Sequence, residues 1–329
     1  MHVCLWKGMG AKAFLRDWAL IICMAVGVAA YFVYAALEPG PELRRVAGYS
    51  VAWLQPVMIF CMLFLTFCRI DPRELRLCKW HLWLLLIQCG IFAAIGLPLI
   101  WMPQGDVRVV LEGAMLCMIC PTATAAAVVT RKLGGSIAHV TTYTILINLA
   151  ASITVPIIIP YVHPNHGMTT LNASLLILGK VFPLLLMPFV GAILLRYLWP
   201  KARKALVKIA DLPFYIWMVA LALAMTVTTK SIAHSTVPVT TQLWLVAVSL
   251  LCCVFQFWAG RHIGRAYDDS VSAGQAMGQK NTVFAIWLGF TFFTPITSIV
   301  GGFYSIWHNV ANSWQLYKHR KQESITCKD

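Results

Sequence analysis

Lys280 is a basic residue in a segment that otherwise suits the interior of a lipid bilayer. The segment reads GQAMGQKNTVFAIWLGF, residues 274–290, and places Gln275 and Gln279 on the N-terminal side of the lysine. At about 1.5 Å per residue, a lysine about nine residues into a membrane span lies about 14 Å deep, near the midplane. A charge at that depth costs at least about 2.5–3.5 kcal/mol on insertion scales, so Lys280 requires a specific explanation.

Three arrangements would reduce the cost of burying Lys280. Its amine can be neutral, since burial favours the uncharged form of an amine. It can pair with an acid, for which Glu112 is the candidate, although Glu112 is predicted to lie near the outer end of another span. It can also donate to backbone carbonyl groups that a break in a helix leaves free. We favour the third arrangement combined with the first; a lysine with a purely structural role is the alternative.

A second interruption lies at Pro121, in the apolar stretch ICPTATAAAVV, residues 119–129. A proline inside a helix removes one backbone donor and disturbs the preceding turn. In lipid, the carbonyl groups freed by such a break need a partner from the protein, an ion or trapped water. Thr122 and Thr124 offer hydroxyl and backbone groups beside the break. Lys180 is another basic residue in an apolar stretch, and it either attracts a substrate carboxylate or faces a wet cavity.

The composition is that of a membrane protein. Of the 329 residues, 60% are hydrophobic and 12% are charged, and that charged share is about half of the roughly 25% found in soluble domains. Eleven cysteines are scattered along the chain, many in apolar runs, so we expect buried thiols and no disulfide framework. The Cys117-x-x-Cys120 spacing is also interpreted as structural, because no second pair accompanies it. His163 and His166 fall in a predicted outer loop, where we expect no metal site.

The basic residues predict the orientation of the chain. With a cytoplasmic N-terminus, 20 Lys and Arg residues lie in cytoplasmic segments, and Lys180 and Lys280 lie within spans. The outer segments hold four, namely Arg44, Arg45, Arg108 and Lys230. This positive-inside bias accounts for the net charge of +14, so no nucleic acid partner is expected. The N-terminus (1–17) and the tail (318–329) are then cytoplasmic. Apolar runs of about 20 residues predict ten spans, at approximately 18–36, 49–68, 82–102, 109–130, 137–161, 171–199, 209–229, 241–263, 271–293 and 296–317.

Ten spans divide into two halves of five, residues 18–161 and 171–317. Because five is odd, the second half is predicted to lie upside down relative to the first, as in inverted-repeat secondary transporters. The fourth and ninth spans occupy equivalent positions in the two halves, and they contain the interruptions at Pro121 and Lys280. Paired interruptions of this kind predict a transport site where two broken helices meet. A simple kink in a packed helix is the alternative for Pro121.

Three stretches of the chain resemble the bile acid:sodium symporter family, namely CPTATAAAVVTRKLGG (120–135), GQAMGQKNT (274–282) and GGFYSIWHNVANSW (301–314). The resemblance covers most of the chain and implies an all-α membrane protein with ten transmembrane helices. It implies a core domain of spans 3–5 and 8–10 and a panel domain of spans 1, 2, 6 and 7. In that fold, spans 4 and 9 unwind and cross, and substrate binds between the domains. His308 and Asn309 match family residues that face this cavity; hydrogen bonding between helices is their alternative role.

The sodium sites implied by this resemblance are degenerate. The family pattern CPGGTASN has Ser and Asn ligands where this chain has Ala126 and Ala127, and a hydroxyl ligand of the fifth span is replaced by Val140. The glutamate that the family shares between two sodium ions is Gln275 here. Because sodium prefers hard oxygen ligands with negative charge nearby, we expect impaired sodium binding and assign no metal site.

Other polar positions match the family pattern more closely. Gln279 is retained, Gln88 matches a glutamine near the second sodium, and Thr144 keeps a hydroxyl group. Lys280 stands where asparagine is usual, although a one-residue shift aligns Asn281 with that asparagine instead. The expected substrate-binding residues are Thr122, Thr124, Asn281, His308, Asn309 and Lys180, and the expected ion-coupling residues are Lys280, Gln275, Gln279, Gln88 and Thr144.

These features together predict a secondary active transporter of small organic anions, such as bile acids or other carboxylates. We expect a monomer in a lipid membrane that uses no cofactor and no sodium, with Lys280 in place of the ion and coupling to protons or to exchange. A conventional sodium-coupled symporter is the first alternative, and a transport-inactive binding or sensor protein is the second. An intramembrane enzyme is disfavoured because the spans contain no HExxH, GxSxG or paired aspartates.

Overall fold

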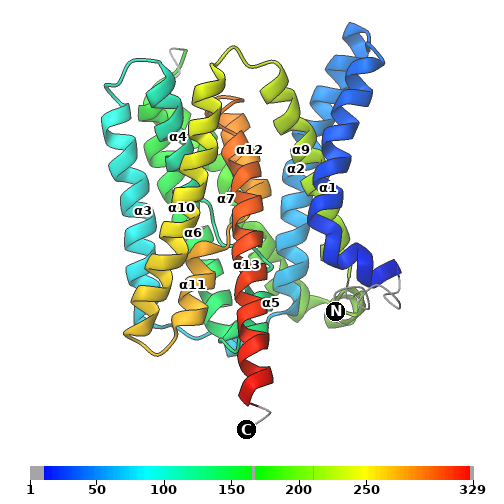
Figure 1. Ribbon diagram of the computed structural model, residues 1–329, viewed down its shortest axis with the longest axis vertical. Helices are drawn as coiled ribbons and strands as arrows, with labels where there is room; N and C mark the ends of the chain where they lie inside the picture. Colours follow the sequence, from blue (N-terminus) through cyan, green and yellow to red (C-terminus); the bar gives the residue numbers. More distant parts are fainter. Residues whose placement is uncertain (1–10, 165–166, 210, 327–329) are drawn as a thin grey trace.

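The computed structural model describes residues 11–164, 167–209 and 211–326, and within these ranges the regular elements are helices (Figure 1). Residues 1–10 of the predicted cytoplasmic N-terminus, His166 and residues 327–329 of the tail lie outside the described ranges. In chain order the elements are α1 (Ala11–Ala36), α2 (Pro41–Arg69), the 3₁₀ turn η2 (Pro72–Glu74), α3 (Lys79–Leu99), α4 (Asp106–Ile119), α5 (Ala126–Lys132), α6 (Ile137–Val162), α7 (Thr170–Leu198), α8 (Pro200–Lys208), α9 (Leu212–Ala233), α10 (Val239–Arg265), α11 (Ser270–Gly278), α12 (Thr282–Phe292) and α13 (Ile299–Thr326).

Several of these helices have the length and composition of membrane spans. By these two criteria six described helices can cross a bilayer, namely α2, α3, α6, α7, α9 and α10. Their outward faces carry large apolar side chains, such as Trp53 and Trp244, which are more than half exposed. Such a surface is disfavoured in water and is suited to lipid. The chain is therefore built as a multi-pass membrane protein.

Helices occupy all ten predicted segments, and the fourth and ninth segments are each split into two shorter helices. The predicted boundaries were wrong at several ends, since α3 begins at Lys79 and α9 continues to Ala233. Lys230, which was predicted in an outer loop, lies in the last turn of α9. A helix continues its hydrogen bonds through polar residues that lower local hydropathy, so an apolar run underestimates its length. The short basic helix α8 was not predicted.

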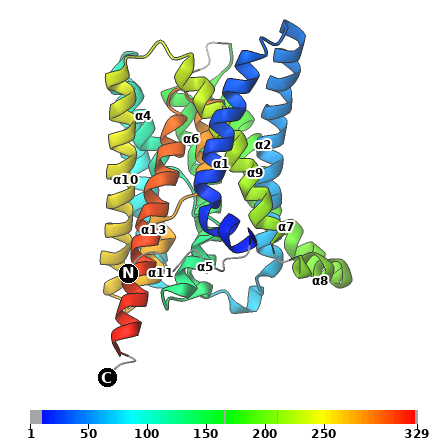
Figure 2. The same ribbon diagram turned by 45° about the vertical axis from the view of Figure 1, so that its right-hand side comes forward.

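Two groups of helices lie side by side in Figures 1 and 2. On one side, α9 packs against both α1 and α2; on the other, α3, α4, α6, α10 and α11 pack together. The helix α7 contacts α2 and α6, and α13 contacts α9, α10 and α12, so these helices connect the groups. The described chain begins in α1 and ends in α13 at the same end of the molecule (Figure 1).

The helices α10 and α11 approach each other closely, and this contact positions the break in the ninth segment. A Cβ atom added to Gly260 of α10 would lie 2.5 Å from the carbonyl O of Ala273 in α11. A Cβ atom added to Gly278, the last residue of α11, would lie 2.4 Å from the ring of Phe257. Real Cβ atoms do not approach other atoms this closely, so the two glycines allow the end of α11 to lie directly against α10.

Candidate functional site

The two broken helices meet where their chains leave helical structure. The first break lies between Ile119 and Ala126, and the second lies between Gly278 and Thr282. The extended backbones of the two breaks form an antiparallel β-bridge, so the structure contains both predicted breaks and places them against one another. The bridge pairs Thr122 with Lys280, and its hydrogen bonds run from Ala123 N to Gln279 O (2.8 Å) and from Asn281 N to Pro121 O (2.8 Å).

Side chains of the first break and of neighbouring helices bond further carbonyl groups at and beside the breaks. Gln88 of α3 donates through Nε2 to Cys120 O (2.9 Å), and its Oε1 accepts from the hydroxyl of Tyr143 in α6 (2.9 Å). Backbone polar groups at membrane depth are satisfied inside the protein because lipid offers no partner. Further bonds run from Tyr304 OH to Gly278 O (2.9 Å), from Thr122 Oγ1 to Ala276 O (2.5 Å), from Cys120 Sγ to Asn281 O (2.9 Å) and from Gln256 Nε2 to Cys117 O (3.3 Å).

The Lys280 side chain is buried at this crossing, with only 2% of its surface exposed. Its Nζ has no hydrogen-bond partner among the described residues. The prediction that Lys280 donates to the freed carbonyl groups was therefore wrong, and other backbone amides and side chains bond several of those groups. The crossing therefore holds a buried amine that forms no hydrogen bond with the described residues.

The acid that was considered as a partner for Lys280 is bonded elsewhere. Glu112 is fully buried in α4, where its Oε1 accepts from Arg108 Nε at 2.9 Å. Arg108, which was predicted in an outer segment, is itself buried and donates to the carbonyl groups of Leu99 (2.8 Å) and Val162 (2.5 Å). His163 Nε2 lies 3.0 Å from Glu112 Oε1, without the alignment of a hydrogen bond. Glu112 thus belongs to a separate ionic cluster.

A small cavity of about 60 Å³ lies beside the crossing. Residues of both breaks and of α13 line it, together with Met62 of α2 and Trp217 of α9. This volume holds one or two water molecules and is far below the roughly 300–1,000 Å³ of a typical small-molecule site. The described conformation is therefore closed to a large organic anion. The predicted site residues that line the cavity are Thr124, Gln279, Lys280, Asn281, His308 and Asn309.

Two of these residues carry further buried polar atoms without a partner in the described chain, His308 Nδ1 and Gln279 Oε1. Two others are bonded within their own helices. Asn309 Nδ2 donates to Ser305 O at 2.7 Å, and Asn281 Oδ1 accepts from Phe284 N at 3.3 Å, which caps the start of α12. The cavity thus combines an amine, an imidazole and amide groups in a closed space. This arrangement suits reversible binding of a small polar or anionic group.

A family model matches residues 19–303, which include both broken helices and the bridge between them. The chain belongs to the SBF-like CPA transporter family. This membership confirms the predicted relationship to bile acid:sodium symporters and identifies the family as one of membrane transporters. His308 and Asn309 lie just beyond the matched residues. No curated protein sequence matches the chain.

Several predicted residues of this SBF-like transporter do not line the cavity. Gln88 and Thr122 support the crossing through the bonds given above. Thr144 Oγ1 donates to the carbonyl group of Val140 (2.8 Å), one turn earlier in its own helix. Lys180 is exposed on α7, where its Nζ lies 5.7 Å from the ring centroid of Phe292.

The residues at the positions where the resemblance implies sodium ligands make other contacts. Gln275 donates through Nε2 to Asn312 Oδ1 (3.0 Å) and to Gln315 Oε1 (2.9 Å), and these bonds tie α11 to α13. Ala126 is fully buried, and Ala127 packs against the hydrophobic core. Neither alanine brings a side-chain oxygen to the crossing.

The sequence interpretation missed residues that support the crossing of this transporter. Gln256, in α10, bonds both Cys117 O and the hydroxyl of Tyr304 (3.1 Å). Tyr143 holds the amide of Gln88 in place. The available signal was an uncharged polar group within an apolar run, since such a group needs a partner inside the protein.

Proposed function

We propose that this chain is a secondary transporter of small organic anions, with ten membrane spans in two inverted halves and both termini in the cytoplasm. Family membership, the long apolar helices and the paired helix breaks support the proposal. In this proposal, spans 3–5 and 8–10 form the core domain, and spans 1, 2, 6 and 7 form the panel domain. The chain acts as a carrier and not as an enzyme. Its substrate binds where Met62 and Trp217 face the crossing.

The observation that carries the proposal is the buried amine of Lys280 between the two broken helices. It forms no hydrogen bond within the described chain, and Glu112, the acid considered as its partner, is paired with Arg108. A buried cation without a partner is costly, so a bound carboxylate gains energy by supplying the missing charge. Movement of α2 and α9 away from the crossing would enlarge the cavity enough to admit the anion.

The residues at the sodium positions implied by the family resemblance support transport without sodium. Ala126 and Ala127 offer no side-chain oxygen, and Gln275 is bonded to α13 in place of the family glutamate. In this proposal the amine takes the place of the metal ion, while backbone and side-chain bonds hold the two broken helices together. If the amine loses and regains a proton in each cycle, transport is coupled to protons. If the amine stays charged, the protein exchanges one anion for another.

A conventional sodium-coupled symporter is the second candidate, and one observation favours it. Gln275 Oε1 and Gln279 Oε1 are both buried without a hydrogen-bond partner in the described residues. Amide oxygens are hard ligands of the kind that bind alkali and alkaline-earth cations. A sodium ion held by these two oxygens would satisfy them, and it would require the amine of Lys280 to be neutral or to point elsewhere.

A binding titration distinguishes the two candidates. Purified protein is titrated with taurocholate and with succinate, in 150 mM sodium chloride and in 150 mM choline chloride. Transport without sodium predicts dissociation constants that agree within about twofold between the salts. A tenfold tighter dissociation constant in sodium, equivalent to about 1.4 kcal/mol, would reject sodium independence and support the symporter.

Uptake into liposomes separates a transporter from a binding or sensor protein that retains the fold. Protein is reconstituted, and the internal concentration of the labelled anion that binds best is followed over time. A transporter equilibrates or accumulates the anion faster than protein-free vesicles do. Binding without uptake at both pH 6 and pH 8 would overturn the transport proposal and leave the sensor.

A further inference from the structure

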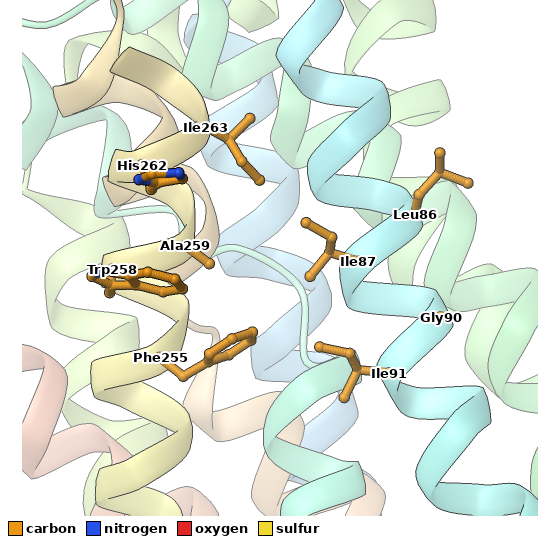
Figure 3. A pocket seen from close by; sticks show the side chains of 9 residues that line it. All are labelled: Leu86, Ile87, Gly90, Ile91, Phe255, Trp258, Ala259, His262 and Ile263. Atoms are coloured by element: carbon orange, nitrogen blue, oxygen red, sulfur yellow. The ribbon is translucent and has the colours of Figure 1, made fainter. Parts of the chain in front are cut away.

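A second hollow lies on the outer surface of the molecule, between α3 and α10 (Figure 3). Its volume is about 440 Å³, and it is open to the surroundings rather than enclosed. Leu86 and Ile91 form the α3 wall, and Phe255, Trp258 and His262 form the α10 wall. We call this hollow the α3–α10 groove. Because α3 and α10 both have the properties of membrane spans, the groove opens into lipid.

The groove exists because a glycine stands where other residues would fill it. A Cβ atom added to Gly90 would meet no other atom within 4 Å. Opposite this gap, Phe255 and Trp258 project from α10, and Trp258 is 60% exposed. The lining is almost entirely apolar apart from the His262 ring, which stacks on Trp258 with centroids 5.4 Å apart. The shape and polarity are those of a site for a hydrocarbon chain.

One end of the α3–α10 groove is polar and carries basic side chains, and Asp268 and Asp269 follow α10 at the same end. Arg265 is exposed three residues beyond His262, and residues three apart on a helix lie on the same face. Lys79 is exposed at the start of α3, two turns before Leu86 on the same side. At this end Trp83 Nε1 donates to Tyr267 OH at 3.0 Å. Tryptophan and tyrosine concentrate at membrane–water interfaces, so this end lies at headgroup depth.

We propose that the α3–α10 groove binds one acyl chain of an anionic phospholipid, whose phosphate lies beside His262, Arg265 and Lys79. The apolar floor accepts the chain, and the basic end supplies the charge that attracts an anionic headgroup. The same two helices support the crossing on their buried faces, through Gln88 of α3 and Gln256 of α10. A lipid chain wedged between α3 and α10 therefore stiffens the supports of the two broken helices.

The test uses native mass spectrometry of the full-length protein with added lipid. Dioleoylphosphatidylglycerol is compared with dioleoylphosphatidylcholine, which has the same chains and no net charge. We expect one molecule of the anionic lipid to remain bound at least five times more often than the zwitterionic lipid. Equal retention of the two lipids would overturn the proposal. Detection of a protein dimer that dissociates when lipid is added would also overturn the proposal, because the groove would then be an interface between two copies.

Two glycine variants locate the lipid. Gly90→Leu fills the groove and should reduce retention of the anionic lipid at least fivefold. Gly179→Leu is the matched control, since a Cβ atom on Gly179 of α7 also meets no atom within 4 Å, and it should leave retention unchanged. Equal loss in both variants, or no loss in Gly90→Leu, would reject the groove as the site. Melting temperatures measured without lipid check that both variants remain folded.

A third variant tests the basic end. Arg265→Gln should reduce the preference for the anionic over the zwitterionic lipid at least threefold while leaving binding of the zwitterionic lipid unchanged. If the preference for the anionic lipid persists in both Arg265→Gln and Lys79→Gln, the basic residues have no role in lipid selection and the proposal is rejected.

Discussion

Thr122 and Lys280 lie opposite one another in the β-bridge that joins the two broken helices. The pairing fixes the backbone of Lys280, while its Nζ has no hydrogen-bond partner in the described part of the chain. The amine therefore adds little to the geometry of the crossing, which the surrounding backbone and side-chain bonds maintain. The backbone of Lys280 thus contributes to the geometry of the crossing, whereas its amine does not. A substitution of the side chain can therefore test the role of the amine alone.

Replacing the amine of Lys280 by an apolar group should abolish function without unfolding the protein. Lys280→Met keeps an unbranched side chain and removes a buried charge, a change that is often neutral or stabilising. We expect an unchanged or higher melting temperature, at least a tenfold loss of anion uptake, and no dependence of the residual uptake on pH between 6 and 8. Thermal melts and liposome uptake measure these quantities.

The control for this substitution is Lys180→Met, which removes an exposed basic residue of α7. It should reduce uptake less than threefold and preserve the pH profile. If Lys280→Met retained full uptake with the profile of the unaltered protein, the amine would have only a structural role. Equal losses in both variants would place the site of anion recognition outside the crossing.

The hydroxyl of Thr122 should stabilise the crossing, because it donates to the carbonyl O of Ala276 at 2.5 Å in a fully buried position. Thr122→Val is nearly isosteric and leaves that carbonyl group unbonded, so the free energy of unfolding should fall by about 1–2 kcal/mol. The control is Thr228→Val, since Thr228 donates to Ala224 O one turn earlier in its own helix (3.0 Å), and such bonds contribute little. Thermal melts that gave equal shifts for both variants would contradict this account.

The positions of the two breaks could be predicted because their signals are local. Pro121 interrupts a helix by its own covalent structure, and Lys280 with its flanking glutamines interrupts an apolar run. The fate of the Lys280 amine could not be predicted in this way. It depends on which groups bond the freed carbonyls, and these come from residues distant in sequence, such as Gln88 at Cys120 and Tyr304 at Gly278.

The ionic cluster around Arg108 illustrates the same limit. A basic residue beside the end of an apolar run is normally interpreted as part of a solvated loop. Here the ends of three helices meet at Arg108, and its guanidinium group donates to the carbonyl groups of Leu99 and Val162. Burial of Arg108 therefore results from tertiary packing of α3, α4 and α6, for which the local sequence of α4 contains no signal.

The Arg108–Glu112 pair should be a major contributor to stability, because both side chains are at least 95% buried and 2.9 Å apart. Glu112→Gln leaves the guanidinium group without its counter-charge, although the carbonyl bonds remain. We expect the free energy of unfolding to fall by about 3 kcal/mol, the low end of the range for breaking a buried pair. Glu42→Gln is the control, since Glu42 and Arg45 form an exposed pair at 3.9 Å worth about 0–1 kcal/mol. Similar melting temperatures for the two variants would show that the buried pair is not a major contributor.

The ion pair between Asp71 and Arg196 should make the stability of the protein depend on pH. Arg196 Nη1 lies 2.8 Å from Asp71 Oδ2, and the hydrogen bond from Arg196, aided by one from Arg73 N, lowers the pKa of Asp71 below its usual 3.8. A lowered pKa in the folded state stabilises the protein above the unfolded pKa, and this contribution is lost as pH falls through the folded pKa.

Asp71→Asn should therefore lower the melting temperature at pH 7 but not at the most acidic pH at which the protein still melts cooperatively. Glu74→Gln, at an exposed position three residues on, should have no such pH-dependent effect. Melting curves between pH 7 and pH 3 decide the point, and a constant difference between Asp71→Asn and the unaltered protein would contradict the role of the pair.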